Sequence, residues 1–252
     1  MRQKYLELIE KQTRFEAEGN FHADIVPPNE KKILPITEKH KYINRNIFYR
    51  FTSFCTRTVF WLVCFAINTF WLRLRIKGRK NLRGLKGAVL TCNHVDMFDN
   101  VMVRQAVMGH KLYVTVGYFN NRNDALGEFL RLAGALPIPN STIPKYTTIY
   151  RNFDNAIEYY LEKKNFVLFY PEQSLWWRYE KLRPFKDGAF HYAVKNNVPI
   201  VPMYITWRKN KKGATIHIMP PVRPDENLSR KENIVNMKNA NVESINRLQK
   251  NF

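Results

Sequence analysis

The chain has 252 residues, of which 41 are Lys or Arg and 21 are Asp or Glu, so its formal net charge at pH 7 is +20. This length suits one main domain with appendages, and the charge indicates an anionic partner: a phospholipid surface, nucleic acid or a phosphorylated substrate. The three cysteines, Cys55, Cys64 and Cys92, are an odd number in apolar surroundings, which favours reduced structural thiols in the cytosol. They also lack paired metal-ligand spacing, so no zinc or iron–sulfur pattern is present in the sequence.

The first 41 residues are predicted to form a polar N-terminal arm and linker. Residues 1–18 are charged throughout and lack the apolar core of a signal peptide, so we expect this segment to stay in the cytosol. Residues 24–35 carry three prolines, which is typical of an extended linker.

Residues 42–84 are predicted to form a membrane-associated helical region. Residues 58–72 are uncharged, but at helical rise they cover roughly 22 Å of a hydrocarbon core of roughly 30 Å, which is short for a simple span. Arg50, Arg57 and Asn68 share one side of the extended helix and leave an aromatic and aliphatic face opposite. Together with basic residues on both flanks, this pattern favours an amphipathic helix or helix pair docked on an anionic cytoplasmic leaflet. A tilted single span and a core helix of a soluble protein are the alternatives.

Residues 85–224 alternate between short apolar runs and amphipathic segments, which predicts an α/β fold with a mainly parallel sheet flanked by helices. Residues 225–252 read as a polar C-terminal tail with one peripheral helix. The expected strands are 87–92, 112–116, 135–138, 166–170 and 200–206, with a further strand, 214–219, at an edge, and the expected helices are 96–108, 124–132, 145–163 and 187–195.

A histidine and an aspartate, His94 and Asp99, directly follow the first of these strands. With Asp96 as the N-cap of the next helix, His94 lies in the connection and Asp99 in the first turn, where the two side chains can meet. An imidazole can accept a hydroxyl proton near neutral pH, and a carboxylate can orient it. The alternatives are a capping box of Asp96 and Asp99 with His94 as a loop residue, and a metal site, which lacks a second ligand cluster. We expect no metal and no cofactor.

Three further blocks follow this histidine block in order: YPE at 170–172, FKDGAF at 185–190 and VPIVP at 198–202. In order and spacing, the four blocks resemble those of the glycerolipid acyltransferase family typified by lysophosphatidic acid acyltransferases, over residues 85–206. Four ordered blocks are far more specific than one motif.

The resemblance implies a membrane-associated O-acyltransferase of phospholipid synthesis that moves an acyl chain from acyl-CoA or acyl carrier protein to a lysophospholipid of the 1-acylglycerol-3-phosphate type. His94 would deprotonate the acceptor hydroxyl and Asp99 would orient the imidazole, without an acyl-enzyme. Glu172 matches a family position that contacts the acceptor, and Lys186 matches a basic position near it. The implied substrate-binding residues are Glu172, Gln173, Ser174, Arg178 and Lys186.

The chain departs from the family pattern at two positions that carry phosphate-binding arginines. Where the family has Pro-Glu-Gly-Thr-Arg, residues 171–178 read PEQSLWWR, and the block at 134–140 ends in Pro-Asn instead of an arginine. Arg178, Arg183 and Lys145 are candidates to replace them, or the acceptor is a different lipid or a glycan-bearing alcohol. Trp176 and Trp177 are expected to stack on the acceptor or to sit at the membrane surface.

Two non-enzymatic classes also fit parts of the sequence. One is a membrane-docking protein on a degenerate acyltransferase fold, against which the intact His94 and Asp99 count. The other is a basic nucleic-acid-binding protein, although no nucleic-acid-binding motif is recognisable and no specific nucleic acid partner is expected. The expected partners are therefore the thioester donor, a lysolipid acceptor and an anionic membrane surface, at the cytoplasmic face of a membrane.

Overall fold

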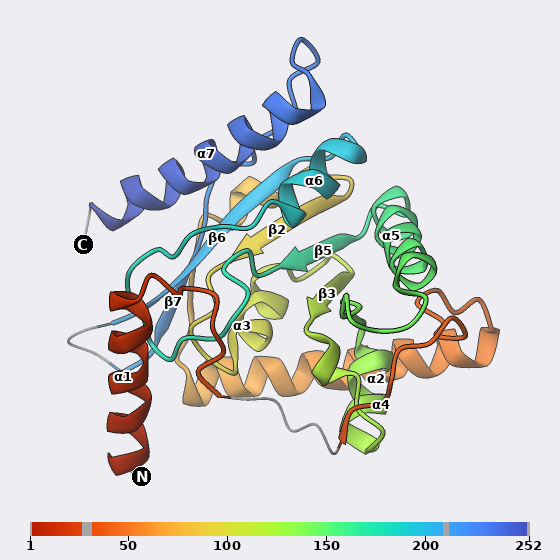
Figure 1. Cartoon of the computed structure of the whole chain (residues 1–252), viewed down its shortest axis with the longest axis horizontal. Coiled ribbons are helices and arrows are strands. Elements are labelled where there is room, and N and C mark those ends of the chain that lie inside the picture. Colours follow the sequence, from red (N-terminus) through yellow and green to blue (C-terminus); the bar gives the residue numbers. More distant parts are fainter. Residues whose placement is uncertain (1, 27–31, 209–211, 251–252) are drawn as a thin grey trace.

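The structure, a computed structural model, describes residues 2–26, 32–208 and 212–250. Within these residues, seven strands form one sheet in the order β1-β7-β6-β2-β5-β3-β4 (Figure 1). All neighbouring strands pair in parallel except β6 and β7, so the predicted mainly parallel α/β sheet is confirmed. The strands are β1 (Arg75–Lys77), β2 (Ala88–Cys92), β3 (Leu112–Val116), β4 (Ala135–Pro137), β5 (Phe166–Phe169), β6 (Ile200–Trp207) and β7 (Ala214–Ile218).

Helices cover both faces of the sheet. Alternate strand residues point to opposite faces, and in β2 all of them are buried. In β2, Val89 joins an apolar cluster with α5, α6 and α7, whereas Leu90 and Cys92 join a second cluster with α3 and η2. The helices are α1 (Arg2–Ala17), α2 (Ile47–Ala66), its π-helical continuation η2 (Ile67–Trp71), α3 (Asp99–Ala106), α4 (Ala125–Ala133), α5 (Tyr146–Glu162), α6 (Gly188–Lys195) and α7 (Arg230–Gln249), with short 3-10 turns at η3 (Arg79–Leu82) and η4 (Tyr118–Asn120).

The six predicted strands are confirmed to within one residue at either end, but the predicted edge position of 214–219 is wrong. β1 pairs with β7 on its outer side, so β1 and β4 are the edges of the sheet. β1 has three residues, two of them exposed and basic, and therefore gives no apolar run in the sequence. The predicted C-terminal helix is confirmed as α7, whose buried Asn241 donates a hydrogen bond to Thr91 Oγ1 at 2.7 Å.

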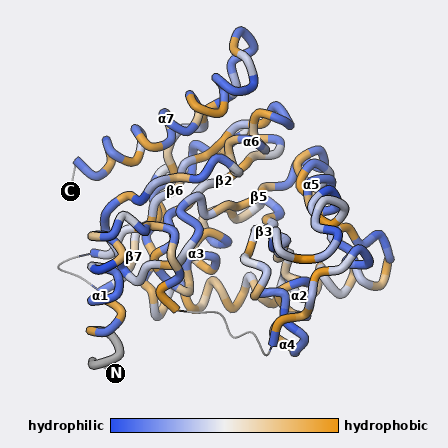
Figure 2. The backbone as a smooth tube through the Cα atoms, viewed as in Figure 1, coloured by the Kyte–Doolittle hydropathy of each residue, from blue (hydrophilic) through white to orange (hydrophobic). Residues whose placement is uncertain are grey.

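The helix α2 has the reverse of the usual polarity of a soluble helix, because its polar side faces the protein. Arg57 donates to the carbonyl oxygen of Leu112 at 2.8 Å, and in η2 the buried Asn68 donates to that of Val101 at 2.9 Å. The outer side carries aromatic residues such as Phe48 and Phe51, which are 78% and 67% exposed. Figure 2 shows the hydrophobic character of α2 along one side of the molecule.

Residues 47–71 form one helix long and apolar enough to cross a membrane by length and composition, and only 11% of its most apolar window is buried. That low burial distinguishes it from the core helix of a soluble protein. The helix that the sequence predicts in residues 42–84 is therefore present, and its apolar side lies on the outside of the molecule.

Candidate active site

The residue that follows β2, Asn93, is bonded to the neighbouring strand β6 through its side chain. Asn93 Nδ2 donates to the carbonyl oxygen of Ile205 at 3.0 Å, and Asn93 Oδ1 accepts from the Ile205 backbone N–H at 2.7 Å. These two bonds replace a backbone pair of the ladder with β6, so the main chain is free to turn after Asn93. The next residue, His94, consequently lies at the carboxyl edge of the parallel strands, where α/β proteins bind their ligands.

The imidazole of His94 and the carboxylate of Asp99 are directly paired. His94 Nδ1 lies 2.9 Å from Asp99 Oδ2, and the exposed fractions of the two side chains are 24% and 0%. An ionised carboxylate on Nδ1 selects the tautomer that carries its proton there, which leaves the lone pair on Nε2. The pair therefore presents a proton acceptor on the side of the ring away from Asp99.

Asp99 also stabilises the turn in which His94 lies. Its Oδ2 accepts from the backbone N–H groups of Val95 at 2.7 Å and Asp96 at 3.0 Å. The predicted N-cap role of Asp96 is wrong, because α3 begins at Asp99 and the Asp96 carboxylate instead accepts from Phe98 N–H at 3.0 Å. The Asp99 carboxylate thus contacts both the imidazole and the main chain of the turn, and its predicted role in orienting His94 stays a prediction.

One face of the His94 ring lies against Tyr170, which follows β5. The ring centroids are 4.2 Å apart with an interplanar angle of 20°, which is a stacked contact. Burial raises the pKa of the Tyr170 phenol well above its usual range, so this ring is neutral. The imidazole is thus held by a hydrogen bond at its edge and by a ring on its face.

Glu172 and Arg183 form a buried ion pair beneath the His94 turn. The Glu172 side chain is 1% exposed, and its Oε2 accepts from Arg183 Nη2 at 2.8 Å and from the His94 backbone N–H at 3.3 Å. Arg183 in turn donates to the carbonyl oxygen of His94 at 3.3 Å and to that of Ser174 at 2.6 Å. Burial raises the pKa of Glu172, against the opposing effect of the Arg183 guanidinium.

These contacts have a consequence for Glu172, which the family resemblance assigns to the acceptor. Its carboxylate contacts protein groups only, so a direct contact with a substrate would require it to exchange these partners. The observed bonds instead tie the main chain of His94 to the loop that follows β5. The acceptor contact stays a prediction, and the position of Glu172 supports a positioning role.

The two residues that follow Glu172 point in different directions. Gln173 is exposed and has φ 68°, in the left-handed region that favours glycine, which explains physically why a glycine suits this position in the family. Ser174 is 6% exposed, and its hydroxyl donates to the carbonyl oxygen of His22. Gln173 is therefore open to solvent, whereas Ser174 faces the N-terminal segment.

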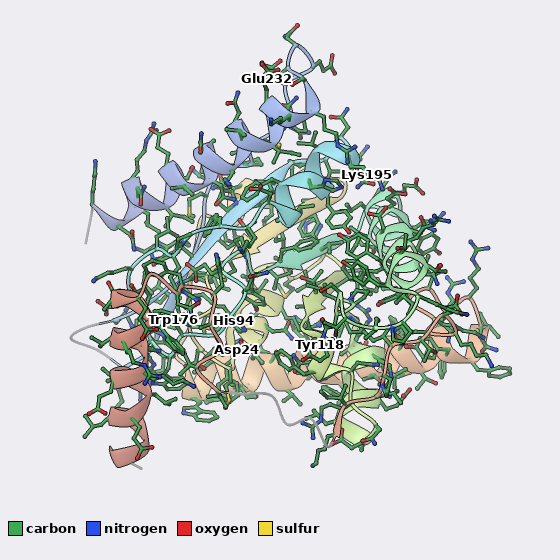
Figure 3. All side chains as sticks on the ribbon, viewed as in Figure 1. Asp24, His94, Tyr118, Trp176, Lys195 and Glu232 are labelled. Atoms are coloured by element: carbon green, nitrogen blue, oxygen red, sulfur yellow. The ribbon has the colours of Figure 1, made fainter. Side chains whose placement is uncertain are left out.

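The N-terminal segment contributes to the site in a way that the sequence does not predict. Trp176 is fully buried, donates through Nε1 to the carbonyl oxygen of Ala23 at 3.1 Å, and stacks on Phe21. The expectation that Trp176 stacks on an acceptor or sits at the membrane surface is therefore wrong. In Figure 3, the labelled Trp176 and His94 lie near Asp24, and the backbone N–H of Trp176 donates to the His94 carbonyl oxygen at 3.0 Å.

His22 is a titratable residue of this segment that sequence reasoning missed. Its Nδ1 lies 3.3 Å from the carbonyl oxygen of Glu172. Burial lowers the pKa of His22, and the positive charges of Lys186 and Arg183 lower it further. No motif marks this histidine, because only the packing of the N-terminal segment under the loop brings it to the site.

Among the candidate phosphate-binding cations, Arg178 lies beside the His94 turn. Its backbone N–H donates to the Val95 carbonyl oxygen at 2.8 Å, its side chain is 41% exposed, and its Nε lies 3.7 Å from Asp96 Oδ2. The guanidinium carbon is 3.3 Å from the centroid of the Trp207 ring. Lys186 is exposed, and its backbone N–H donates to the carbonyl oxygen of Pro171 at 2.9 Å, at the start of the same loop.

The two other candidate cations are occupied elsewhere. Arg183 is buried against Glu172, and Lys145 pairs with Glu38 at 2.6 Å. Within residues 2–26, 32–208 and 212–250, no group of three or more His, Cys, Asp and Glu side chains is arranged to hold a metal ion.

Fold and site together define the class: an α/β protein with an oriented histidine, held by a buried aspartate, at the carboxyl edge of a mainly parallel sheet. A sequence model described as "Acyltransferase" matches residues 73–206, which is more than half of the chain. The chain therefore belongs to the acyltransferase family, as the four sequence blocks indicate.

The curated relatives agree on one kind of protein. The chain is 26% identical over 175 residues to a 1-acyl-sn-glycerol-3-phosphate acyltransferase from Limnanthes douglasii, covering 64% of this chain and 58% of the relative. It is 24% identical over 167 residues to the protein of the same description from Escherichia coli strain K12, covering 61% and 64%. The matches thus span less than two thirds of the length of these relatives.

The solved structure of a family member has the same fold. The crystal structure of the 1-acyl-sn-glycerophosphate (LPA) acyltransferase PlsC from Thermotoga maritima matches with a TM-score of 0.51 and 18% sequence identity, over 78% of this chain and 86% of that one. At this identity the likeness concerns the architecture, which is the mainly parallel sheet flanked by helices.

Proposed function

We propose that this chain is a membrane-associated O-acyltransferase that moves an acyl chain from a thioester donor, acyl-CoA or acyl carrier protein, to a lysophospholipid of the 1-acylglycerol-3-phosphate type, in phospholipid synthesis. The observation that carries the proposal is the 2.9 Å contact between His94 Nδ1 and the fully buried Asp99. It accompanies family membership and relatives described as 1-acyl-sn-glycerol-3-phosphate acyltransferases.

The chemistry follows from the orientation of the ring. His94 Nε2 accepts the proton of the acceptor hydroxyl, and the hydroxyl oxygen forms a bond to the thioester carbonyl carbon. The carbon–sulfur bond then breaks, and the leaving thiolate accepts the proton from the imidazolium. Asp99 holds the neutral imidazole in the required tautomer and stabilises the imidazolium that forms, without itself taking the proton. Acyl transfer is direct, without an acyl-enzyme.

Arg178 is proposed to bind the phosphate of the acceptor, with Lys186 as a second cation at the start of the loop. The family arginine that follows Pro-Glu-Gly-Thr is replaced here by Leu175, and Arg178 is the partly exposed guanidinium next to the His94 turn. A planar guanidinium suits a phosphate because it can donate two parallel hydrogen bonds. Gln173 completes the exposed side of this proposed acceptor site.

The outer side of α2 is proposed to dock on the cytoplasmic face of a membrane. Its polar residues bind carbonyl groups of the protein, and its aromatic residues are exposed. The net charge of +20 favours an anionic leaflet. Since Arg57 and Asn68 hold the helix along the domain, docking in the plane of the interface suits these contacts better than a span.

The test is transfer of a labelled acyl chain from acyl-CoA to a lysolipid panel by the purified full chain. We expect His94→Ala to remove transfer, and Asp99→Asn to lower kcat by about a hundredfold to ten thousandfold, because an amide disfavours the required tautomer and does not stabilise the imidazolium. Arg178→Gln is expected to raise KM for phosphate-bearing acceptors more than kcat falls. Turnover retained by His94→Ala would overturn the mechanism.

A further inference from the structure

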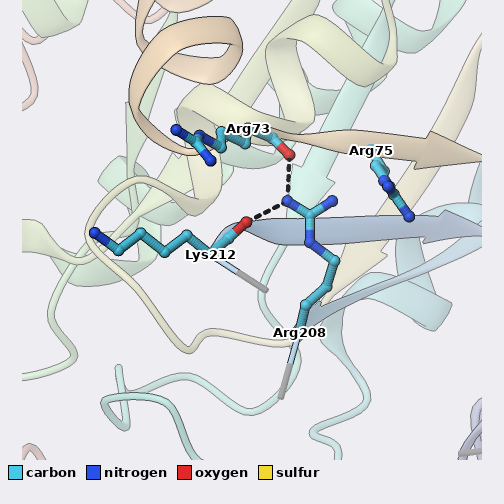
Figure 4. A pocket seen from close by; sticks show the side chains of 4 residues that line it. All are labelled: Arg73, Arg75, Arg208 and Lys212. Atoms are coloured by element: carbon cyan, nitrogen blue, oxygen red, sulfur yellow. Dashed lines mark hydrogen bonds between the residues drawn. The ribbon is translucent and has the colours of Figure 1, made fainter. Parts of the chain in front are cut away.

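A cavity of about 390 Å³ at one end of the sheet is lined by four cationic residues: Arg73, Arg75, Arg208 and Lys212 (Figure 4). None of them forms an ion pair with a carboxylate in the described part of the chain. Like charges gathered without a counterion repel one another, and a bound anion would relieve this repulsion.

The central guanidinium of this basic pocket is held in place by the main chain. Arg208 Nη2 donates to the carbonyl oxygens of Arg73, at 2.9 Å, and of Lys212, as the dashed lines in Figure 4 show. Arg73 has φ 42°, a left-handed conformation that residues with a Cβ rarely adopt, and it follows Leu72, the C-cap of η2.

The guanidinium of Arg208 packs so closely on Gly213 that no side chain fits at this position. A Cβ at Gly213 would overlap with Arg208 Nη2 and with the carbonyl oxygen of Leu72, and its φ of 122° also disfavours a side chain. The Nε of Arg208 is buried and lacks a hydrogen-bond partner among the described residues. The pocket therefore has one guanidinium fixed by the main chain, with two exposed cations, Arg75 and Lys212, beside it.

The basic pocket lies on the same edge of the sheet as His94. Arg75 begins β1, which runs against β2, and Arg208 follows the end of β6, which runs with β2. Three strand positions separate β1 from β2, so Arg75 lies roughly 14 Å to the side of β2 at the usual strand spacing. Arg208 follows β6, the neighbour of β2, and its guanidinium reaches away from β2 to the carbonyl oxygen of Arg73. The Trp207 ring, in contact with Arg178, lies at the intervening edge.

This distance distinguishes between the phosphates of the two substrates. In a 1-acylglycerol-3-phosphate the phosphate is esterified at the carbon next to the one that bears the reacting hydroxyl, so it must lie close to His94. In acyl-CoA the extended pantetheine arm separates the thioester from the nucleotide phosphates, and this arm is long enough to cross several strand spacings. We propose that Arg73, Arg75, Arg208 and Lys212 bind the nucleotide phosphates of a CoA thioester donor; this inference rests on the proposed acyltransferase function.

The experiment compares two donors with the same acyl chain, acyl-CoA and acyl-pantetheine, which lacks the phosphates. For the double variant Arg75→Gln/Lys212→Gln we expect KM for acyl-CoA to rise at least tenfold at unchanged kcat. With acyl-pantetheine, the variant and the wild type are expected to be equal. Arg83→Gln removes one exposed charge outside the pocket and is expected to behave as wild type.

Calorimetric titration with CoA alone tests the inference independently of turnover. We expect the double variant to bind CoA at least tenfold more weakly than the wild type, with unchanged thermal unfolding. Equal CoA affinity in both proteins, or a wild type that does not bind CoA, would overturn the inference even if acyl transfer is observed. A variant that lost only flotation with anionic vesicles would also overturn it, since the pocket would then bind lipid headgroups. Conversely, CoA binding without acyl transfer would contradict the proposed function alone.

Discussion

At the scale of single residues, neighbouring groups hold both the ring and the main chain of His94. Asp99 binds its Nδ1, Tyr170 stacks on its ring, and the Glu172–Arg183 pair binds the N–H and the carbonyl of its main chain. Such a network leaves the ring one orientation, which is the condition for efficient proton transfer. It also makes the turn sensitive to the loss of any buried charge beneath it.

We expect Arg183→Met to lower the free energy of unfolding by about 3–5 kcal/mol, because it leaves the Glu172 carboxylate buried without its partner. The double variant Glu172→Gln/Arg183→Met should recover part of this loss, since neither charge then remains. Urea unfolding followed by circular dichroism measures both. Equal destabilisation in the single and double variants would contradict a buried ion pair whose partners depend on each other.

At the scale of elements, α2 is the helix whose contacts bear on whether the protein spans a membrane or docks on its surface. Its length of 25 residues with η2 corresponds to roughly 37 Å, enough to span a bilayer, but its polar residues are bound to the domain. The residues that stabilise its position are therefore separate from those proposed to enter the interface. This separation allows membrane binding to be changed without unfolding the protein.

Phe51→Asp/Phe54→Asp is expected to reduce flotation with anionic vesicles at least tenfold, because it places two charges on the proposed apolar docking side. Both phenylalanines are 67% exposed, so the midpoint of thermal unfolding should change little. Val235→Asp on α7, where the valine is 45% exposed, is the matched control and should float as wild type does. Docking through α2 would be refuted by unchanged flotation of the double variant.

At the scale of the whole molecule, a buried histidine, His217, and a half-buried one, His40, make stability depend on pH. Burial, and in each case a neighbouring cation, lowers the pKa of His40 and that of His217 to about 4. In the unfolded chain both return to about 6.5, so between these values the unfolded state binds protons that the folded state does not. The stabilising contribution is complete above about pH 6.5 and is lost as the pH falls toward 4.

We therefore expect the free energy of unfolding to fall between pH 6.5 and 4, by on the order of 3 kcal/mol from His217 alone, which is 5% exposed. Urea unfolding at several pH values measures this slope. His217→Gln should reduce the slope without changing its sign, since His40 still titrates. A stability that is flat over this range in the wild type would contradict two imidazoles that stay neutral in the folded protein.

The sequence alone predicts most of the sheet, because its strands are apolar runs with turn residues between them. It does not predict β1, because the two exposed basic residues of this strand follow no strand pattern. It also places the start of α3 at Asp96 instead of Asp99, because the hydrogen bonds from Asp99 back to His94 and to two backbone amides form only in the folded turn. The domain boundaries after residues 41, 84 and 224 stay predictions.

The sequence by itself determined the family and singled out the His94–Asp99 pair, because ordered motifs and strand periodicity are local properties of the chain. Only the tertiary structure decided that Glu172 is paired with Arg183, that Trp176 is buried against the N-terminal segment and that four cations from two distant segments share one pocket. Burial and charge pairing depend on which segments meet in space. Arg73 and Arg75 meet Arg208 and Lys212 only because β1 adds to the outer side of β7, and no local pattern contains that contact.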